Sequence, residues 1–394
     1  MNKIKFLILI LPIFLLTGCW NYNELNNLAL ITGISIDKEN NEFVMNYMIS
    51  NAKKSDSSSN GNEASTVLYE GKGDTLAKAA ENINQKLPKI PYLSHAEVII
   101  ISEDVAKENM LKVMDFLLRN PESRKEIYVL ISKGSKASDS LSILTPLENF
   151  PSENIKSNIT SSPSESTTTY TIKYSEFLAK LITEGIEPTI GVIEIEGDIE
   201  KGQDVKSNNK SKQEAVIKLT STAIFKQDKL VYITDNNESI AINLFNNHLS
   251  NTYIETDCQN DKIVTFLTDT SIKKKIKLED NKPKVKIEFE GNGALLEVNC
   301  KIDLEDSEVI KDIQNQVEEK IKQLLESGIN VSKKYKTDIL GFGNILYKYH
   351  PKYWNKIKNN WSDEYLEDLD VEIKTNINLS SKGSLEQTIK EEIK

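Results

Sequence analysis

The chain has 394 residues, with 49 Lys and Arg against 59 Asp and Glu, and a formal net charge of −10. Because nucleic-acid binding requires a basic face that neutralises phosphates, this balance argues against a nucleic-acid partner. A single hydrophobic core stops growing at about 250–300 residues, so we predict more than one domain.

The start of the chain has the pattern of a bacterial lipoprotein signal. Two lysines precede an apolar run over residues 6–16, which is shorter than the roughly 20 residues that a transmembrane helix needs. Leu16-Thr17-Gly18 then place small or aliphatic side chains directly before Cys19. We therefore predict that residues 1–18 are a signal peptide cleaved after Gly18, and that the Cys19 thiol carries a diacylglyceryl thioether. The alternative is a plain signal peptide with a chance cysteine.

Lipid would then be the only attachment of this protein to a membrane. Cleavage removes two lysines and no acid, which takes the net charge from −10 to −12 and opposes adhesion to anionic lipid. Two acyl chains give stable anchoring, and a diacylglyceryl group supplies both. No later stretch of the sequence is long and apolar enough to span a bilayer.

Residues 19–134 are predicted to form an α/β domain with a mixed sheet and helices. The expected strands are 29–36, 43–49, 66–70, 98–101 and 127–131, and the expected helices are one capped by Asp74 and one over 109–119. Residues 98–101 are continuously apolar, which is typical of a central strand buried on both faces. Residues 51–65 are polar and predict a flexible loop.

The composition changes after residue 134. Residues 135–196 are rich in Ser and Thr around 161–169, and we predict a small middle domain with a helix near 174–184 and a strand near 189–195. Residues 197–214 contain almost no large apolar side chain and predict a linker.

Residues 215–382 are predicted to form an α+β domain, a largely antiparallel sheet covered by long helices, followed by a tail over 383–394. The expected strands are 215–225, 230–233, 263–267, 272–278, 285–289 and 294–300. Residues 284–290 alternate charged and apolar side chains, as a strand with one wet face does. The helical spacing of Ile310, Ile313, Val317, Ile321 and Leu324 predicts a helix that packs on the core. The whole chain is thus expected to be a multi-domain α+β protein.

Two cysteines remain after lipidation, Cys258 and Cys300. A location outside the cytoplasm permits a disulfide between them. The alternative, which the pattern favours, is two separately buried thiols in strands.

The sequence contains no recognisable catalytic or cofactor motif. His95, His248 and His350 are widely separated and none belongs to a metal-binding pattern. Gly341-Phe342-Gly343 lacks the third glycine and the acidic residue of a dinucleotide loop, and Gly71-Lys72-Gly73 lacks the P-loop lysine signature. We predict a protein without metal, cofactor or enzymatic activity.

Two regions are candidate partner contacts. Trp20, Glu24 and Leu25 lie in a short stalk beside the lipid-bearing cysteine. Trp354 and Trp361 share one face of a predicted helix that begins at Pro351, and paired aromatic side chains are typical of binding hot spots. The alternative for the tryptophans, which we favour, is that they complete the core of the second sheet.

Several stretches resemble one family. Cys19-Trp20 with Glu24-Leu25, and Thr32-Gly33-Ile34 with Asp37, are similar to the mature start of the Ger(x)C family, the C subunits of nutrient germinant receptors in spore-forming Gram-positive bacteria. Asn21 stands where this family usually has Asp. Further similarity lies in Ser94-His95-Ala96-Glu97-Val98, in Arg119-Asn120-Pro121-Glu122-Ser123-Arg124, and in residues 338–361 with Gly341-Phe342-Gly343 and Trp354.

The resemblance implies a mixed α/β protein of three domains on the outer surface of the spore inner membrane. It also implies assembly with integral-membrane A and B subunits and a requirement in nutrient-triggered spore germination, with Cys19 as the functional residue that carries over. The runner-up is a solute-binding lipoprotein of a transporter, whose two similar α/β lobes disagree with the antiparallel pattern over 215–300. A lipid-anchored wall hydrolase is a third alternative.

Overall fold

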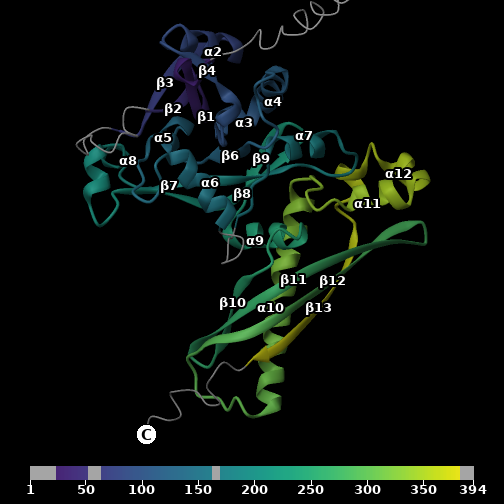
Figure 1. The fold of residues 1–394 in the computed structure, drawn as a ribbon. Coiled ribbons are helices and arrows are strands. Elements are labelled where there is room, and N and C mark those ends of the chain that lie inside the picture. Colours follow the sequence, from purple (N-terminus) through teal and green to yellow (C-terminus); the bar gives the residue numbers. More distant parts are fainter. Residues whose placement is uncertain (1–23, 52–63, 162–168, 382–394) are drawn as a thin grey trace, which may run out of the picture.

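The computed structural model describes residues 24–51, 64–161 and 169–381. Two sheets form the two halves of an elongated molecule (Figure 1). The first sheet has nine strands in the order β3-β2-β1-β5-β6-β7-β8-β9, with β4 paired to β1, and the second has the order β10-β11-β12-β13. The predicted α+β class with more than one sheet is confirmed.

The first sheet is built around a parallel centre. Its strands are β1 Leu28–Glu39, β2 Glu42–Ser50, β3 Thr66–Gly73, β4 Ile90–Tyr92, β5 Val98–Ser102, β6 Tyr128–Ser132, β7 Thr189–Gly197, β8 Ala215–Lys226 and β9 Lys229–Ile233. β1, β5, β6 and β7 run parallel, and antiparallel strands extend both edges. The apolar residues of β5 are completely buried, as predicted for a central strand.

Helices cover both faces of this sheet. They are α2 Leu76–Asn84, α3 Glu103–Glu108, α4 Met110–Arg119, α5 Ala137–Ser142, α6 Pro151–Ser161, α7 Tyr174–Ile182 and α8 Ile199–Gly202, with short 3-10 turns η2 Leu25–Asn27, η4 Leu93–His95 and η6 Val205–Asn209. α2, α3, α4 and α7 share one core with the sheet, and α5 and α6 share another. Thr75 caps α2 by accepting from the Lys78 amide, so the cap predicted at Asp74 was one residue early.

The predicted middle domain does not separate from the first half. β7 pairs with β6, and β8 pairs with β7, so the hydrogen-bond ladder is continuous through 135–196 and on to residue 233. The predicted linker over 197–214 contains α8 and η6, and the Asp198 amide bonds the Glu214 carbonyl. Its polar composition reflects a surface crossing between two paired strands of the first sheet.

The second half is a four-stranded sheet packed on one long helix. Its strands are β10 Thr252–Cys258, β11 Asp261–Glu279, β12 Lys282–Val298 and β13 Asp370–Ser381, and its helices are α9 Asn236–Phe245, α10 Ser307–Lys334, α11 Phe342–Tyr349 and α12 Pro351–Ile357, followed by a π-helical turn η7 Trp361–Tyr365. The short strands predicted over 263–278 and over 285–300 are each one long, bulged strand. β13 pairs parallel to β12, so the sheet is antiparallel only in part.

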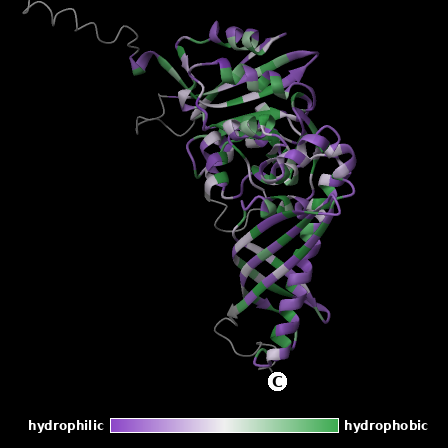
Figure 2. Cartoon of the chain, turned by 90° about the vertical axis from the view of Figure 1, so that its right-hand side faces the viewer, coloured by the Kyte–Doolittle hydropathy of each residue, from purple (hydrophilic) through white to green (hydrophobic). Residues whose placement is uncertain are grey.

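The core stripe predicted for the long helix is confirmed. Ile313, Val317 and Ile321 of α10 are buried against the sheet. Apolar and polar residues alternate along the strands of the lower sheet in Figure 2, because one face packs on α10 and the other meets water.

One buried carboxylate organises the junction between the halves. Asp338 is only 1 % exposed. Its side chain accepts from the amides of Phe342 (3.0 Å) and Gly343 (2.6 Å) and from the Trp361 indole (2.9 Å). Burial raises the pKa of Asp338, and these three donors and the nearby Lys274 oppose that rise. The carboxylate therefore folds the 338–343 turn and ties it to η7.

A loop of the first half binds this turn through backbone groups. The Asn344 amide donates to the Gly185 carbonyl (2.7 Å), and the Glu187 amide donates to the Asp338 carbonyl (2.9 Å). Gly185 has φ +74°, and a Cβ there would lie 2.3 Å from the carbonyl carbon of Gly343. The close approach of the two backbones thus requires glycine at position 185.

A second contact between the halves is a stacked ring pair. The His248 ring, after α9, lies 3.6 Å from the Tyr170 ring, centroid to centroid. Burial, with Lys180 and Lys274 nearby, lowers the pKa of His248 to about 3. The imidazole is therefore neutral at physiological pH.

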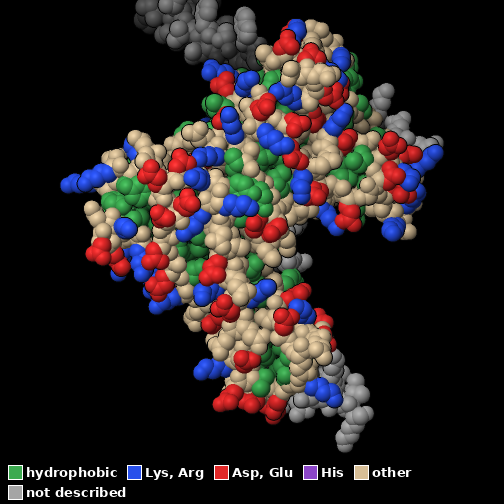
Figure 3. All heavy atoms as spheres, turned by 180° about the vertical axis from the view of Figure 1, so that it is seen from behind, with side chains coloured by type: hydrophobic (Ala, Val, Ile, Leu, Met, Phe, Trp, Pro, Cys, Tyr) green, Lys and Arg blue, Asp and Glu red, His purple; other side chains and the backbone are tan. Residues whose placement is uncertain are grey.

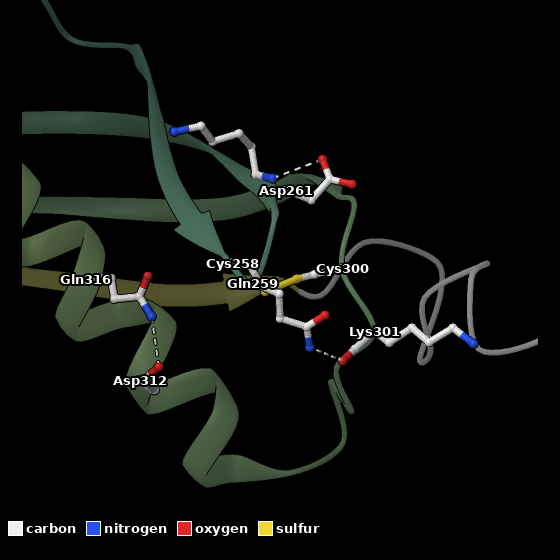
Figure 4. Close-up of a disulfide and its surroundings, with 8 residues drawn as sticks. Cys258, Gln259, Asp261, Cys300, Lys301, Asp312 and Gln316 are labelled. Carbon is white, nitrogen blue, oxygen red and sulfur yellow. Dashed lines mark hydrogen bonds between the residues drawn. A yellow bond between two sulfur atoms is a disulfide. The ribbon is translucent and has the colours of Figure 1, made fainter.

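The far end of the second sheet carries a disulfide (Figure 4). Cys258 ends β10, Cys300 follows β12, and their Cα atoms are 6.0 Å apart. The favoured expectation of separate thiols was wrong. The β10–β11 hairpin and the end of β12 meet beside Asp261, which brings together two cysteines 42 residues apart.

We expect Gly185→Ala to destabilise the protein more than Gly134→Ala, measured as the free energy of unfolding in urea. Both glycines have positive φ, but a Cβ at Gly134 meets nothing within 4 Å. The control should lose about 1 kcal/mol from its backbone conformation alone. Gly185→Ala should lower the free energy of unfolding by at least about 2 kcal/mol, because the new Cβ clashes with the Gly343 backbone in addition to the strain of the positive φ. Equal losses would contradict the close approach.

We expect His248 to make stability depend on pH. Between about pH 6.5 and pH 3 the unfolded chain takes up a proton that the folded chain does not. The free energy of unfolding should therefore fall as the pH drops through this window, by up to about 1.4 kcal/mol per pH unit. His248→Phe keeps a stacked ring without a titrating group. Urea titrations at pH 7, 6 and 5 should show that the free energy of unfolding depends less on pH in this variant than in the wild type. Equal pH dependence of the two proteins would contradict the role of His248.

Candidate partner-binding site

The predicted lipidation site and the predicted partner contacts fall into three places. Cys19 and Trp20 lie outside the described residues. Glu24 and Leu25 open the described chain, and Leu25 is 68 % exposed. These two side chains are available to a partner, directly ahead of the first strand of the first sheet.

The two tryptophans of the C-terminal motif are part of the core. Trp354 and Trp361 are 3 % and 2 % exposed, and their rings meet edge to face at 5.7 Å. The Trp354 indole donates to a Glu184 carboxylate oxygen at 2.6 Å, which ties it to the first half. A Cβ at Gly343 would lie 2.8 Å from both rings. Their placement agrees with the core interpretation and removes them from the accessible surface.

The first N-terminal motif is also structural. The Asp37 carboxylate, at the end of β1, accepts from the amides of Ala137 (2.7 Å) and Ser138 (3.0 Å). It thereby holds the first turn of α5 across 100 residues of sequence. Burial raises the pKa of Asp37, and the two amide bonds oppose the rise. At Gly33, a Cβ would lie 2.9 Å from Leu141, so α5 packs directly on β1.

The second N-terminal motif brings two distant segments together. The Ser94 hydroxyl of η4 donates to the Glu122 carbonyl (3.1 Å) after α4. The Glu122 amide in turn donates to the Asn120 side chain (3.0 Å). These contacts hold η4 and the loop after α4 side by side. The two segments, together with α2, border a groove.

We call this feature the α2–α4 groove, a hollow of about 910 Å³. The helices α2 and α4 lie in the upper half of Figure 1. Its apolar lining includes Phe43, Tyr47, Leu76, Ile90, Pro91 and Phe116. Phe43 and Tyr47 come from β2, and the helices α2 and α4 form the walls. Ile90 is 46 % exposed, so a large apolar side chain is open to an occupant. This volume lies within the range of small-molecule binding pockets, about 300–1,000 Å³.

Tyr47 gives the floor of the groove a polar atom. Its side chain is buried, and burial with the nearby Glu122 carboxylate raises the pKa of Tyr47 to about 12. The phenol is therefore a neutral donor. Its hydroxyl has no hydrogen-bond partner within the described part of the chain.

The charged lining of the groove is more acidic than basic. Asp115 pairs with Arg119 at 2.9 Å, and Glu81 pairs with Lys78 at 2.9 Å. Asp74, Glu122 and Lys112 also line the groove and have no ion pair with another described residue. Elsewhere acidic and basic side chains are interspersed, as on the face seen in Figure 3, with hydrophobic atoms in patches between them.

The junction between the halves contains a second, smaller hollow of about 330 Å³. Charged side chains on its wall are already paired, Lys226 with Asp363 at 3.1 Å and Lys358 with Glu184 at 3.7 Å. This hollow is a polar part of the interface between the two halves.

The histidines serve local structure. His95 packs near Tyr92, His248 stacks on Tyr170, and His350 precedes the first turn of α12. Within residues 24–51, 64–161 and 169–381, no group of three or more His, Cys, Asp or Glu side chains is arranged to hold a metal ion. In those same ranges no helix is both long and apolar enough to cross a membrane.

Comparison with known proteins gives matches over nearly the whole chain. Residues 21–195 match the family described as "Spore germination protein N-terminal domain", and residues 220–383 match "Spore germination B3/ GerAC like, C-terminal". The chain is 25 % identical to spore germination protein KC of Bacillus subtilis (strain 168), covering 98 % of this chain and 97 % of that protein. It is 23 % identical to spore germination protein B3 of the same organism, covering 92 % and 94 %.

The fold is shared with a solved structure. The crystal structure of the GerBC protein superposes with a TM-score of 0.56 at 18 % identity, covering 88 % of this chain and 97 % of that one. The two family models match successive parts of the chain, residues 21–195 and 220–383, and together cover most of it. The chain therefore belongs to the Ger(x)C family of spore germination proteins.

Proposed function

We propose that this protein is the lipid-anchored C subunit of a spore nutrient germinant receptor, and that it assembles with integral-membrane A and B subunits. The observation that carries the proposal is the match of both family domains, over residues 21–195 and 220–383. The similarity to germination protein KC, which spans 98 % of this chain, supports the same role for the whole protein.

The proposed role is structural and involves no catalysis. The lipid on Cys19 holds a folded body beside its partners, which raises its effective concentration and makes a weak contact stable. Glu24 is five residue steps after Cys19, and an extended chain covers at most about 18 Å over that length. The first half would then lie near the bilayer, and the disulfide end of the second half would point away from it (Figure 1).

The disulfide supports a location outside the cytoplasm. Cytosolic proteins of most bacteria keep their thiols reduced, and disulfides persist in oxidising compartments. A Cys258–Cys300 bond fits a domain that is exported and tethered on the outer surface of the membrane.

We expect Cys19→Ala to abolish membrane retention and to impair nutrient-triggered germination of spores. Membrane fractionation and loss of spore refractility would measure the two effects. The control replaces the lipoprotein signal by a conventional cleavable signal, so that the same folded body is exported without lipid. Normal germination with either unanchored protein would contradict the tethered role.

The exposed start of the described chain is the proposed first contact. We expect Trp20→Ala combined with Glu24→Ala to weaken co-purification of the membrane subunits several-fold, without loss of the lipid. Lys38→Ala, at an exposed ion pair with Glu108, is a control outside this segment. Unchanged co-purification would place the contact elsewhere.

A further inference from the structure

The α2–α4 groove adjoins the first residues of the first sheet. Leu28 begins β1 and pairs with Ile90 of β4, and Ala29 pairs with Pro91. Ile90 and Pro91 are both part of the groove lining. One end of the groove is therefore one strand away from the point where the chain enters the fold.

This position limits what can reach the groove in the anchored protein. Leu28 lies nine residues after Cys19, which is at most about 32 Å of extended chain. Neighbouring strands lie about 5 Å apart, so Ile90 is held almost as close to the lipid as Leu28 is. The groove of the anchored protein therefore lies within reach of partners in the membrane.

The chemistry of the groove selects among occupants found there. Its floor and walls are apolar, while its charged lining has an acidic excess: four carboxylates, of Asp74, Glu81, Asp115 and Glu122, against the basic side chains of Lys112 and Arg119. Anionic lipid headgroups would be repelled by these carboxylates and by the acidic chain as a whole. A protein segment with apolar anchors and basic flanking residues satisfies both the lining and the charges.

The walls also indicate the shape of the segment. The helices α2 and α4 border an apolar floor that includes Phe43 and Tyr47. Such a groove accepts the apolar face of an amphipathic helix, with anchors at i, i+3 or i+4, and i+7. The Tyr47 hydroxyl offers a hydrogen-bond donor to a polar group of that helix.

We propose that the α2–α4 groove binds an amphipathic, basic juxtamembrane segment of an integral-membrane partner. The inference rests on the proposed function and adds the surface and the chemistry of the contact. Lipidation and groove binding then act in series: the lipid confines the protein to the membrane, and the groove selects the partner.

Photo-crosslinking in native membranes tests the identity of the occupant. A photoreactive phenylalanine analogue replaces Ala77, an exposed residue of α2 that lines the groove, in the full-length lipidated protein. The control position is Leu111 of α4, which is 52 % exposed and does not line the groove. We expect a crosslink from position 77, absent from position 111, to an apolar peptide with Lys or Arg from a multi-span membrane protein.

Other crosslinked products would overturn the proposal. A product with lipid alone would make the groove a lipid contact, and a product with a second copy of this chain would make it a self-association surface. A product within the same chain, or equal labelling from both positions, would also contradict it.

Filling the groove tests whether its occupant matters for assembly. Ala77→Trp should reduce co-purification of membrane partners at least tenfold, whereas Leu111→Trp should leave it unchanged. Glu122→Lys should also weaken co-purification, most strongly at low salt, because it reverses a charge on the groove; Glu42→Lys, at an exposed site outside it, is the control.

The two proposals fail in different ways. If the wild-type protein co-purifies with membrane partners and Ala77→Trp does so equally well, the groove is not the contact and the receptor role stands. If the wild-type protein has no membrane partner, the proposed function itself fails. Circular dichroism of each variant is the control for retention of the fold.

Discussion

The buried Asp338 carboxylate is the interaction on which the arrangement of the two halves depends. A carboxylate in a low-dielectric interior is costly unless hydrogen bonds compensate for the lost water. Here two amides of the 338–343 turn and the Trp361 indole supply them. The turn so formed presents backbone groups to the Gly185 loop, and main-chain hydrogen bonds join the two halves at this point.

A second buried carboxylate that accepts backbone hydrogen bonds organises the first half. Asp37 on β1 holds the start of α5, so that one buried carboxylate again fixes elements that are distant in sequence. α5 and α6 cover one face of the sheet, which leaves α2 and α4 on the other face. The groove between α2 and α4 is therefore a consequence of how the sheet is covered, and it opens near the point where the chain enters the fold.

Several elements could be predicted from local pattern because their burial is periodic. β5 is continuously apolar, and α10 carries an apolar stripe at helical spacing. α9 was missed because seven successive residues, Ser239 to Phe245, are buried, which erases the amphipathic period; the Asp235 and Glu238 capping box was its only signal. β10 and β13 also alternate, but few of their side chains are strongly apolar, so the sequence pattern is weak. The parallel pairing of β13 depends on β12, which is far away in sequence.

The sequence by itself predicts the lipoprotein signal, and it determined the family, the absence of recognisable catalytic motifs and the sheet-and-helix class, because each is written in local order or composition. Only the tertiary structure decided which strands share a sheet, that Cys258 and Cys300 meet, that the two tryptophans are core residues, and that η4, α2 and α4 enclose a groove. The physical reason is that these are contacts between residues dozens to more than a hundred positions apart. Such contacts are set by strand register and by buried carboxylates. Neither can be predicted from the periodicity of a local stretch of sequence.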